Sequence, residues 1–364
     1  MLEPFEIRSA SGSYPVEIAI NARKAVIDAA KDAIFIVDSK LTETYIGRNR
    51  TLIEIEATEL NKSLDRMSDY IEMMRKAGAT RQSHVVAVGG GIIQDIATFL
   101  TSIYMRGVSW TYLPTTVLAM VDSCIGGKSS INVGSYKNLV GNFYPPQKVL
   151  VDPQFVSTLN LEMMLGGLFE AAKICYAFGA EKFDAYLALA PEIARTPAAV
   201  EPIVDLALRT KKWFIETDEF DRNERLLLNF GHTFGHAIES ATHFGVSHGV
   251  GVGMGMALAC AYARTRTAFT PEGAVRVGKL ESHIRAMFAV LEADPTFVKQ
   301  PVAVAVAMEK FEYDKKHRVD CYRMVTPGAD GALALITIPR DAATRAGLER
   351  AYCDTLAALE WPVA

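Results

Sequence analysis

Four of the seven histidines lie within one short stretch of the chain, at residues 232, 236, 243 and 248. His232 and His236 are four residues apart, a spacing that puts two imidazoles on one face of a helix. Two such histidines and a carboxylate from elsewhere form a common catalytic zinc site. The alternative is a set of core histidines with satisfied hydrogen bonds. Glycines stand beside three of the four histidines, however, and because glycine costs about 1 kcal/mol within a helix, they indicate that another group approaches closely.

The bulk composition excludes several classes of protein. The 364 residues predict two domains, and half of them are hydrophobic, so a large core can form. A net charge of −4 without a basic patch gives no indication of nucleic-acid binding. The five cysteines form no CxxC pair, which argues against a disulfide framework and favours a reducing, cytoplasmic compartment. We see neither a signal sequence nor an apolar run long enough to span a membrane.

The first half of the chain alternates between two kinds of periodicity. Strands are predicted at residues 14–20, 33–38, 51–56, 84–88 and 110–114, and helices at 22–31, 60–77 and 92–104. The strand that begins at His84 runs into three glycines, residues 89–91, which is typical of a turn that cradles phosphate. This alternation predicts a parallel α/β sheet with ligands at the carboxyl ends of its strands.

Two glycine-rich segments match nucleotide-binding motifs only partly. The first fits the dinucleotide fingerprint except that Gln94 takes the place of its third glycine. The second, CIGGKSS at residues 124–130, resembles a P-loop at its GKS end, but Asp122 stands where a P-loop needs glycine. Lys128 and residues 137–138 still lie in glycine-rich loops suited to hold phosphate oxygens. Solvated loop charges are the alternative for these lysines.

Strand signals nearly vanish after residue 153. Helices are predicted at residues 161–190, 198–216, 226–240 and 250–264, and one hairpin is predicted at 321–338. Glu170 lies on an apolar, alanine- and glycine-rich helix, one turn before Lys173. A buried carboxylate needs a partner, so Glu170 is the candidate third metal ligand.

Several ordered segments, between about Ser13 and about Pro339, carry a resemblance to a known family. They are GGGIIQD, YMRGVSWTYLPTTVLAMVDSCIGGKSSIN, KNLVGNFYPPQ, GLFEAAK, LNFGHTFGHAIE, SHG and DKK. In these segments the chain resembles 3-dehydroquinate synthase and its relatives, the sugar-phosphate cyclases. The resemblance implies an α/β N-terminal Rossmann-like domain that binds NAD, residues 1–157. It also implies a mainly α-helical C-terminal domain that binds metal and substrate, residues 158–364, and a homodimer. The charge and hydropathy described above predict neither a nucleic-acid nor a membrane partner.

The resemblance also implies a set of site residues. A zinc or cobalt ion would be held by Glu170, His232 and His248, whereas the spacing alone paired His232 with His236. The residues implied to bind the sugar phosphate are Asp122, Lys128, Asn138, Lys173, Lys211, Arg225, Asn229, His236 and Lys316 (or Lys315), with Arg106 reaching a neighbouring subunit's site. The residues implied to bind NAD are Asp38, Glu59, Lys62, Gly91, Ile92, Ile93, Gln94, Asp95, Thr115, Thr116, Lys137 and Thr158.

The activity implied is that of a carbon–oxygen lyase of the shikimate pathway, which leads to the aromatic amino acids. 3-Deoxy-D-arabino-heptulosonate 7-phosphate would become 3-dehydroquinate with loss of phosphate, and NAD would be reduced and reoxidised within one turnover. Lysines and Arg225 suit a substrate that carries phosphate and carboxylate. Departures from the family pattern leave open a cyclase for sedoheptulose 7-phosphate or glucose 6-phosphate; they are Gln94, Ser130, Tyr136 and Val250. A metal-dependent alcohol dehydrogenase, which shares the broad architecture, is the third alternative.

Overall fold

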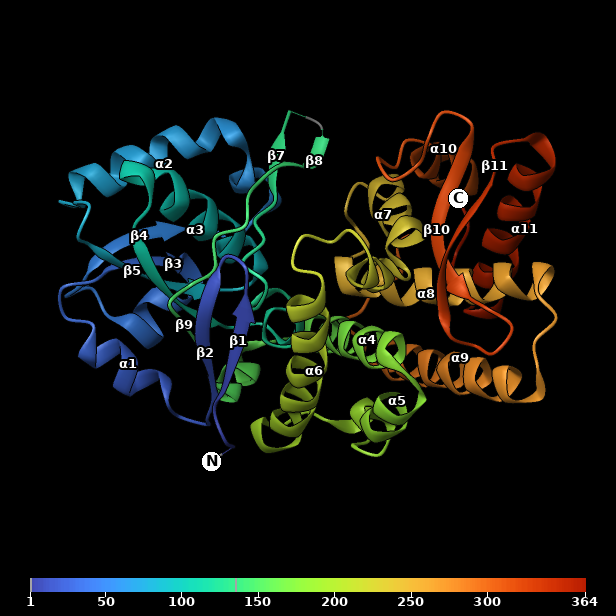
Figure 1. The fold of residues 1–364 in the computed structure, drawn as a ribbon, viewed down its shortest axis with the longest axis horizontal. Helices are drawn as coiled ribbons and strands as arrows, with labels where there is room; N and C mark the ends of the chain where they lie inside the picture. Colours follow the sequence, from blue (N-terminus) through green and yellow to red (C-terminus); the bar gives the residue numbers. More distant parts are fainter. Residues whose placement is uncertain (1, 135) are drawn as a thin grey trace. The chain divides into compact units, whose positions relative to one another are not determined.

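The computed structural model describes residues 2–134 and 136–364, which form two compact units (Figure 1). The first unit comprises Met1–Leu159 and Arg195–Phe220, and the second comprises Asn160–Ala194 and Asp221–Ala364. In the part of the chain that is described, no helix combines the length and the apolar character that crossing a membrane requires.

The first unit is built on a seven-stranded sheet with the order β1-β2-β9-β6-β5-β3-β4. Its strands are β1 (Phe5–Ser9), β2 (Gly12–Ile18), β3 (Ile34–Asp38), β4 (Thr51–Ile55), β5 (His84–Gly89), β6 (Ser109–Pro114) and β9 (Lys148–Val151). All neighbours pair in parallel except β1 and β2. Strands β3 and β5 are buried along most of their length, as expected where helices cover both faces. The predicted parallel sheet is confirmed, whereas β1 and the short strand β9 were not predicted.

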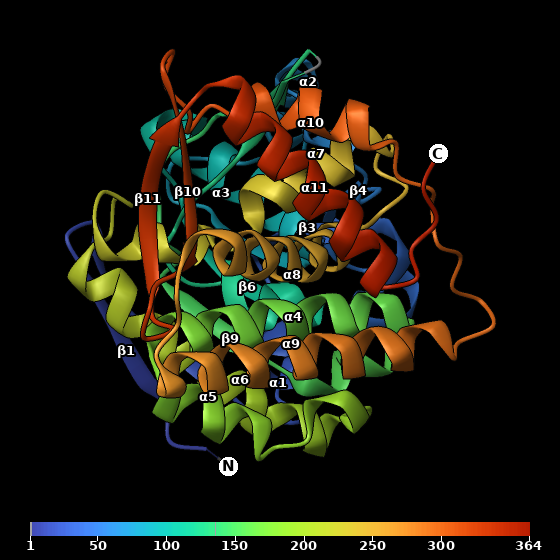
Figure 2. The same ribbon diagram turned by 90° about the vertical axis from the view of Figure 1, so that its right-hand side faces the viewer.

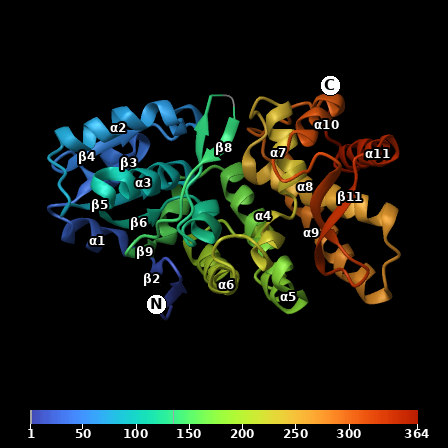
Figure 3. The same cartoon turned by 45° about the horizontal axis from the view of Figure 1, so that its top comes forward.

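Helices cover this sheet on both sides (Figure 3). Helices α2 (Leu64–Lys76) and α3 (Gly91–Ile103) lie on one face, and α1 (Arg23–Ala29) lies on the other. Helix α2 begins later than predicted, because Ser63 is extended and separates it from the short 3-10 helix η3 (Glu59–Lys62). A small hairpin is formed by β7 (Ile131–Val133) and β8 (Tyr136–Val140), and β8 carries the predicted residues Lys137 and Asn138.

The carboxyl ends of three neighbouring strands meet at one edge of the sheet. Val37 of β3 is in register with Val88 of β5, which in turn is in register with Leu113 of β6. The chain leaves these strands at Asp38, at the glycines of residues 89–91, and at Pro114. Residues that follow the three strands therefore lie along a common edge, which is where open α/β sheets bind ligands.

Helix α6 (Pro197–Thr217) falls outside the predicted division of the chain. The sequence predicted a second domain of residues 158–364, but α6 belongs to the first compact unit. It packs against β1 and against two short helices, η5 (Ala119–Ser123) and η6 (Pro153–Thr158). Helical periodicity predicts that α6 has an apolar face. Only the folded structure shows which elements of the chain pack against that face.

The second unit consists of helices and one hairpin (Figure 2). Its elements are α4 (Leu161–Phe178), α5 (Ala180–Leu187), α7 (His232–Ala241), α8 (His248–Arg266), α9 (Pro271–Glu292), α10 (Val304–Glu312), β10 (Cys321–Pro327), β11 (Leu333–Pro339) and α11 (Ala342–Ala358). Helix α8 is enclosed by α4, α7 and α11, and most of its residues are buried. The predicted helix at 226–240 is divided, because Gly231 takes a positive φ of 78° and separates α7 from the short helix η8 (Glu224–Asn229).

Glycines permit an unusually close approach of α7 to α8. A methyl group at Gly255 would overlap the carbonyl oxygen of Gly231, and one at Gly235 would lie 2.6 Å from the oxygen of Gly251. At the start of α8, a methyl group at Gly249 would overlap Gly166 of α4. The glycines beside the histidines therefore do mark a close approach, and the group that approaches is the backbone of a neighbouring helix.

We expect Gly255→Ala to lower the free energy of unfolding by about 1–3 kcal/mol, because an added methyl group has no space between the two helices. Urea denaturation measures this change. Gly278→Ala is the matched control, since a methyl group added at this helical glycine would meet no atom within 4 Å; alanine there should stabilise the protein by about 0.5–1 kcal/mol. Equal effects of the two substitutions would contradict the proposed packing.

Candidate active site

Three helices of the second unit bring a carboxylate and two imidazoles together. Glu170, in the middle of α4, is 1% exposed. Its Oε1 lies 3.6 Å from Nε2 of His232, the first residue of α7, and 3.2 Å from Nε2 of His248, the first residue of α8. One ring nitrogen from each of His232, His236 and His248 lies within 4.8 Å of the other two. The structure thus assembles both predicted histidine pairs around one centre.

The other carboxylate oxygen of Glu170 is taken by an ion pair. Lys173, one helical turn later on α4, is 2% exposed and pairs with Oε2. Charged groups are rarely buried so deeply without a partner of opposite sign. Glu170 therefore has one oxygen held by a cation and one directed at the histidines.

Two of the three histidines are held in the neutral form. Burial lowers the pKa of His232 well below its ordinary value, and the charges of Lys173, the imidazolium of His248 and Lys316 lower it further. Burial also lowers the pKa of His236, and the charge of Lys316 acts in the same direction. A neutral imidazole offers the lone pair that a metal ion requires.

His248 is in a different electrostatic environment. Desolvation lowers the pKa of its ring, but the carboxylates of Glu239 and Glu170 outweigh this and raise the pKa to about 10. Oε1 of Glu239 lies 2.9 Å from Nδ1 of His248. Sequence reasoning missed Glu239, although the signal that identified Glu170, a glutamate on an otherwise apolar helix, is present there as well.

This donor set fits a divalent metal ion. A buried carboxylate oxygen directed at two imidazole nitrogens, with a third imidazole beside them, matches the nitrogen and oxygen ligands of catalytic zinc sites. The rings of His232 and His236 lie 5.2 Å apart, which confirms that the four-residue spacing places them on one face of α7. His243 is exposed beyond the end of this helix and is outside the cluster.

Other predicted residues of the helical unit lie on short connecting segments. Arg225, on η8, is 5% exposed, and Asn229 at the end of η8 donates from Nδ2 to the carbonyl of Leu226 at 3.1 Å. Asp314 fixes the turn that carries Lys316, since its Oδ1 accepts the Lys316 backbone N–H at 2.9 Å. Because the charge of Lys316 acts on His232 and His236, this lysine lies near the histidine cluster.

In the first unit, α6 reaches the glycine-rich segment through one buried lysine. Nζ of Lys211, which is 4% exposed, lies 2.5 Å from Oδ1 of Asp122 and also donates to the Asp122 carbonyl. The structure therefore brings together two residues that are 89 positions apart and that were both predicted to bind substrate. Lys128, on the same segment, is exposed.

Gln94, which departs from the dinucleotide fingerprint, has a structural role. Its side chain is 3% exposed and donates from Nε2 to the Lys128 carbonyl at 2.8 Å. The next residue, Asp95, accepts the backbone N–H of Ser130 at 2.9 Å. The first turn of α3 thus holds the glycine-rich segment on both sides of Ser129.

Most of the residues predicted to bind NAD fall into two groups within this unit. The first lies on the common edge of the sheet and consists of Asp38, residues 91–95 and residues 115–116. A methyl group at Gly91 would meet only the Ser123 hydroxyl, at 3.8 Å, so an anion can approach the backbone N–H groups at the start of α3. This edge fits a dinucleotide.

The second group surrounds a buried lysine. Nζ of Lys62 lies 3.0 Å from Asp95, 3.1 Å from Asn138 and 3.8 Å from Glu59. Glu59 also pairs with Lys137 at 3.5 Å. These side chains therefore connect η3, α3 and the β7–β8 hairpin.

Two predicted residues belong to neither group. Thr158, at the end of η6, donates its hydroxyl to the carbonyl of Phe155 at 2.7 Å. Arg106 lies in an exposed turn in which it and Met105 have positive φ values of 69° and 49°. Non-glycine residues seldom adopt this conformation.

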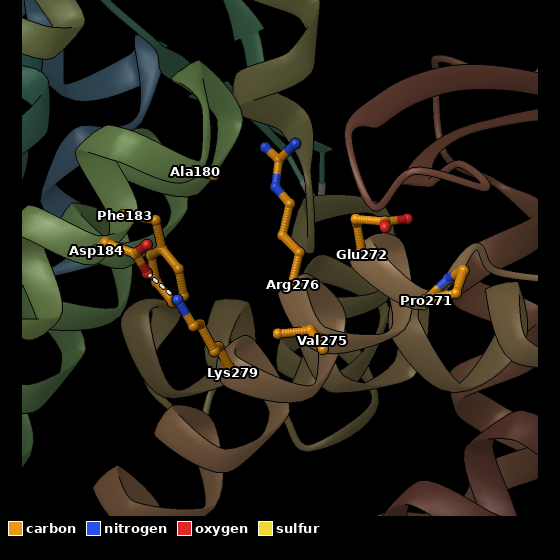
Figure 4. Close-up of a pocket in the computed structure, with 8 residues that line it drawn as sticks. All are labelled: Ala180, Phe183, Asp184, Pro271, Glu272, Val275, Arg276 and Lys279. Atoms are coloured by element: carbon orange, nitrogen blue, oxygen red, sulfur yellow. Dashed lines mark hydrogen bonds and ion pairs between the residues drawn. The ribbon is translucent and has the colours of Figure 1, made fainter.

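A groove of about 370 Å³ lies elsewhere in the helical unit, between α5 and α9 (Figure 4). Phe183, Val275 and Arg276 are among the residues that line it, and Lys279 crosses it to pair with Asp184 at 2.6 Å. The lining includes none of the predicted site residues, so the histidine cluster is the better candidate for chemistry.

Family models and curated relatives agree on one family. Residues 52–165 match the family described as 3-dehydroquinate synthase N-terminal, and residues 167–317 match its C-terminal counterpart. A 3-dehydroquinate synthase of Saccharolobus solfataricus is 33% identical over 296 residues, which cover 80% of this chain and 82% of that protein.

Solved structures show the same fold at lower identity. A 2-deoxy-scyllo-inosose synthase complexed with carbaglucose-6-phosphate, NAD+ and Co2+ has a TM-score of 0.80 at 21% identity, over 96% of this chain and 100% of that one. A 2-epi-5-epi-valiolone synthase from Streptomyces hygroscopicus, with NAD+ and Zn2+ bound, has a TM-score of 0.76 at 23% identity, over 95% and 96% of the two chains.

We expect His248 in chelator-treated protein to stay protonated through neutral pH and to lose its proton near pH 10, because Glu239 and Glu170 stabilise the imidazolium. His232 and His236 should stay neutral well below pH 6.5, because burial lowers the pKa of both rings. NMR titration of the imidazole protons measures the protonation of all three rings, and the spectrum of His248→Ala assigns the His248 signals. Since the folded pKa is raised, this stabilisation is present below pH 6.5 and is lost as the pH rises through about 10. A His248 midpoint near 6.5 would contradict the described pairing.

Proposed function

We propose that this chain, which belongs to the 3-dehydroquinate synthase family, converts 3-deoxy-D-arabino-heptulosonate 7-phosphate to 3-dehydroquinate with release of inorganic phosphate. Its family consists of lyase-type cyclases, so the chain is an enzyme. The observation that carries the proposal is the buried carboxylate of Glu170 directed at His232 and His248, in a chain whose two halves both match this family.

We place a divalent metal ion, Zn2+ or Co2+, on Glu170, His232 and His248. The support is geometric, because Oε1 of Glu170 faces Nε2 of both histidines. His236, on the same helix face as His232, is then available to the substrate. A bound metal ion supplies Lewis-acid polarisation of a substrate oxygen.

NAD is proposed to bind at the common edge of the sheet in the first unit. The N–H groups at the start of α3, from Gly91 to Asp95, suit its pyrophosphate. Asp38, at the end of the neighbouring strand, is placed to accept hydrogen bonds from ribose hydroxyls. The cofactor supplies a reversible hydride transfer, so the overall reaction involves no net redox change.

Cationic side chains of this chain are proposed to bind the two anionic groups of the substrate. The guanidinium of Arg225 can hold a carboxylate with two parallel hydrogen bonds. Lys316, whose charge acts on the histidine cluster, is proposed to bind a phosphate oxygen, with Lys315 as the alternative. The further proposed substrate residues are Arg106, Asp122, Lys128, Asn138, Lys173, Lys211 and Asn229.

A homodimer and a cytoplasmic location are also proposed. The exposed turn at Arg106 holds this residue in a left-handed conformation, which suits a side chain presented to another subunit. All five cysteines are free, and four of them are buried, which is compatible with a reducing compartment.

The decisive experiment mixes the purified protein with Zn2+, NAD+ and one sugar phosphate at a time, and measures phosphate release and product mass. We expect turnover of 3-deoxy-D-arabino-heptulosonate 7-phosphate, with NAD+ at less than one equivalent per product. Sedoheptulose 7-phosphate and glucose 6-phosphate should not react, because they offer Arg225 no carboxylate. A preference for either neutral sugar phosphate would indicate the related cyclase, and net NADH formation from a simple alcohol would indicate a dehydrogenase.

Arg225→Lys should lower kcat/KM for the acid substrate by about 2 kcal/mol, or about 30-fold, because lysine cannot reproduce the two parallel hydrogen bonds. Steady-state kinetics measure this change. Arg222→Lys is the matched control, since Arg222 is exposed on the same segment, and it should change the rate little. If Arg225→Lys leaves the reaction unchanged, Arg225 has a structural role only.

A further inference from the structure

Glu239, the last residue of the segment LNFGHTFGHAIE, is a buried carboxylate to which neither the sequence motifs nor the resemblance assigns a role. It lies on α7, is 3% exposed, and places Oε1 2.9 Å from Nδ1 of His248. The contact joins two helices, since His248 begins α8. Burying this charge costs free energy that the hydrogen bond to the histidine must offset.

A glycine of α8 provides the space that the Glu239 side chain occupies. A methyl group at Gly251 would lie 3.2 Å from Cγ and 3.5 Å from Oε1 of Glu239. The glycine thus leaves the space in which the carboxylate lies beside His248. Because this space lies against the backbone of α8, packing limits the directions that the side chain can take.

The hydrogen bond selects one form of the His248 ring. An ionised carboxylate only accepts, so Nδ1 must carry the proton. In the neutral ring, Nε2 is then the nitrogen with a lone pair, and this atom faces Oε1 of Glu170 at 3.2 Å.

His232 has a parallel arrangement. Its Nδ1 lies 3.3 Å from the carbonyl oxygen of Phe230, and its Nε2 also faces Oε1 of Glu170. His236 differs from both, because no carbonyl or carboxylate is paired with its ring in the described part of the chain. The two histidines with an oxygen on Nδ1 are thus the two whose Nε2 atoms converge on Glu170.

We propose that Glu239 is a positioning residue that holds His248 in the tautomer and orientation of a metal ligand through Nε2. The inference rests on the proposed metal site and deepens it. It also separates the three histidines by role, since the described part of the chain pairs no carbonyl or carboxylate with the ring of His236, which is then available to the substrate. Carboxylates and carbonyls that hold ligand histidines in this way typically raise metal affinity about 10- to 100-fold.

The test measures Co2+ binding to metal-stripped protein by competition with a chromophoric chelator. Glu239→Gln should weaken Co2+ binding about 10- to 100-fold, because an amide can donate to Nδ1 and place the proton on Nε2. Glu239→Asp keeps the charge and should bind Co2+ more tightly than Glu239→Gln. Glu272→Gln, an exposed glutamate on α9, is the matched control and should bind like the wild type.

The order of the two variants distinguishes positioning from packing. Gln has nearly the volume of Glu and Asp does not, so a purely structural role predicts tighter binding in Glu239→Gln than in Glu239→Asp, and that order would overturn the proposal. Wild-type affinity in Glu239→Gln would overturn it too while leaving the metal site intact. If the wild type itself does not bind Co2+, both the proposed metal site and the proposed positioning role are wrong. Circular dichroism of each metal-stripped variant verifies that it is folded.

Discussion

The helical unit depends on one constraint, the burial of the carboxylate of Glu170 in an apolar helix. A charge with 1% exposure must be paired, and Glu170 is paired on both sides. Lys173, on the same helix, takes one oxygen, and two imidazoles face the other. Satisfying this carboxylate requires α7 and α8 to begin beside the middle of α4.

That requirement explains why these helices are rich in glycine. The backbones of α4, α7 and α8 approach so closely that a methyl group at Gly249 or Gly255 would overlap a neighbouring backbone. Each glycine in a helix interior costs about 1 kcal/mol relative to alanine, a cost that close packing and the paired charges offset. The same approach creates the space beside Gly251 in which Glu239 meets His248. The close packing of the helices and the pairing of the buried charges therefore depend on each other at this site.

In the first unit, the glycine-rich loop at residues 124–130 is held in place by buried side chains from other elements. Gln94 and Asp95 bind the loop at Lys128 and Ser130, and Lys211 binds Asp122 on η5, just before the loop. Glycine allows the backbone to turn, and the buried side chains of α3 and α6 remove the freedom that this creates. The residue that departs from the dinucleotide fingerprint is therefore part of the loop's support.

The sequence by itself determined the parallel sheet, the helical second half and the face shared by His232 and His236. These features follow from periodicity, from β-branched runs and from the positions of glycine, all of which act between residues near in sequence. The ordered motifs also sufficed to identify the family. Only the tertiary structure decided that Nε2 of His248 faces Glu170, that Glu239 holds its other nitrogen, and that α6 packs with the first unit. The physical reason is that a buried polar group is satisfied through space, by whichever distant segment the packing of helices brings within hydrogen-bond reach, and no local pattern encodes that segment's identity.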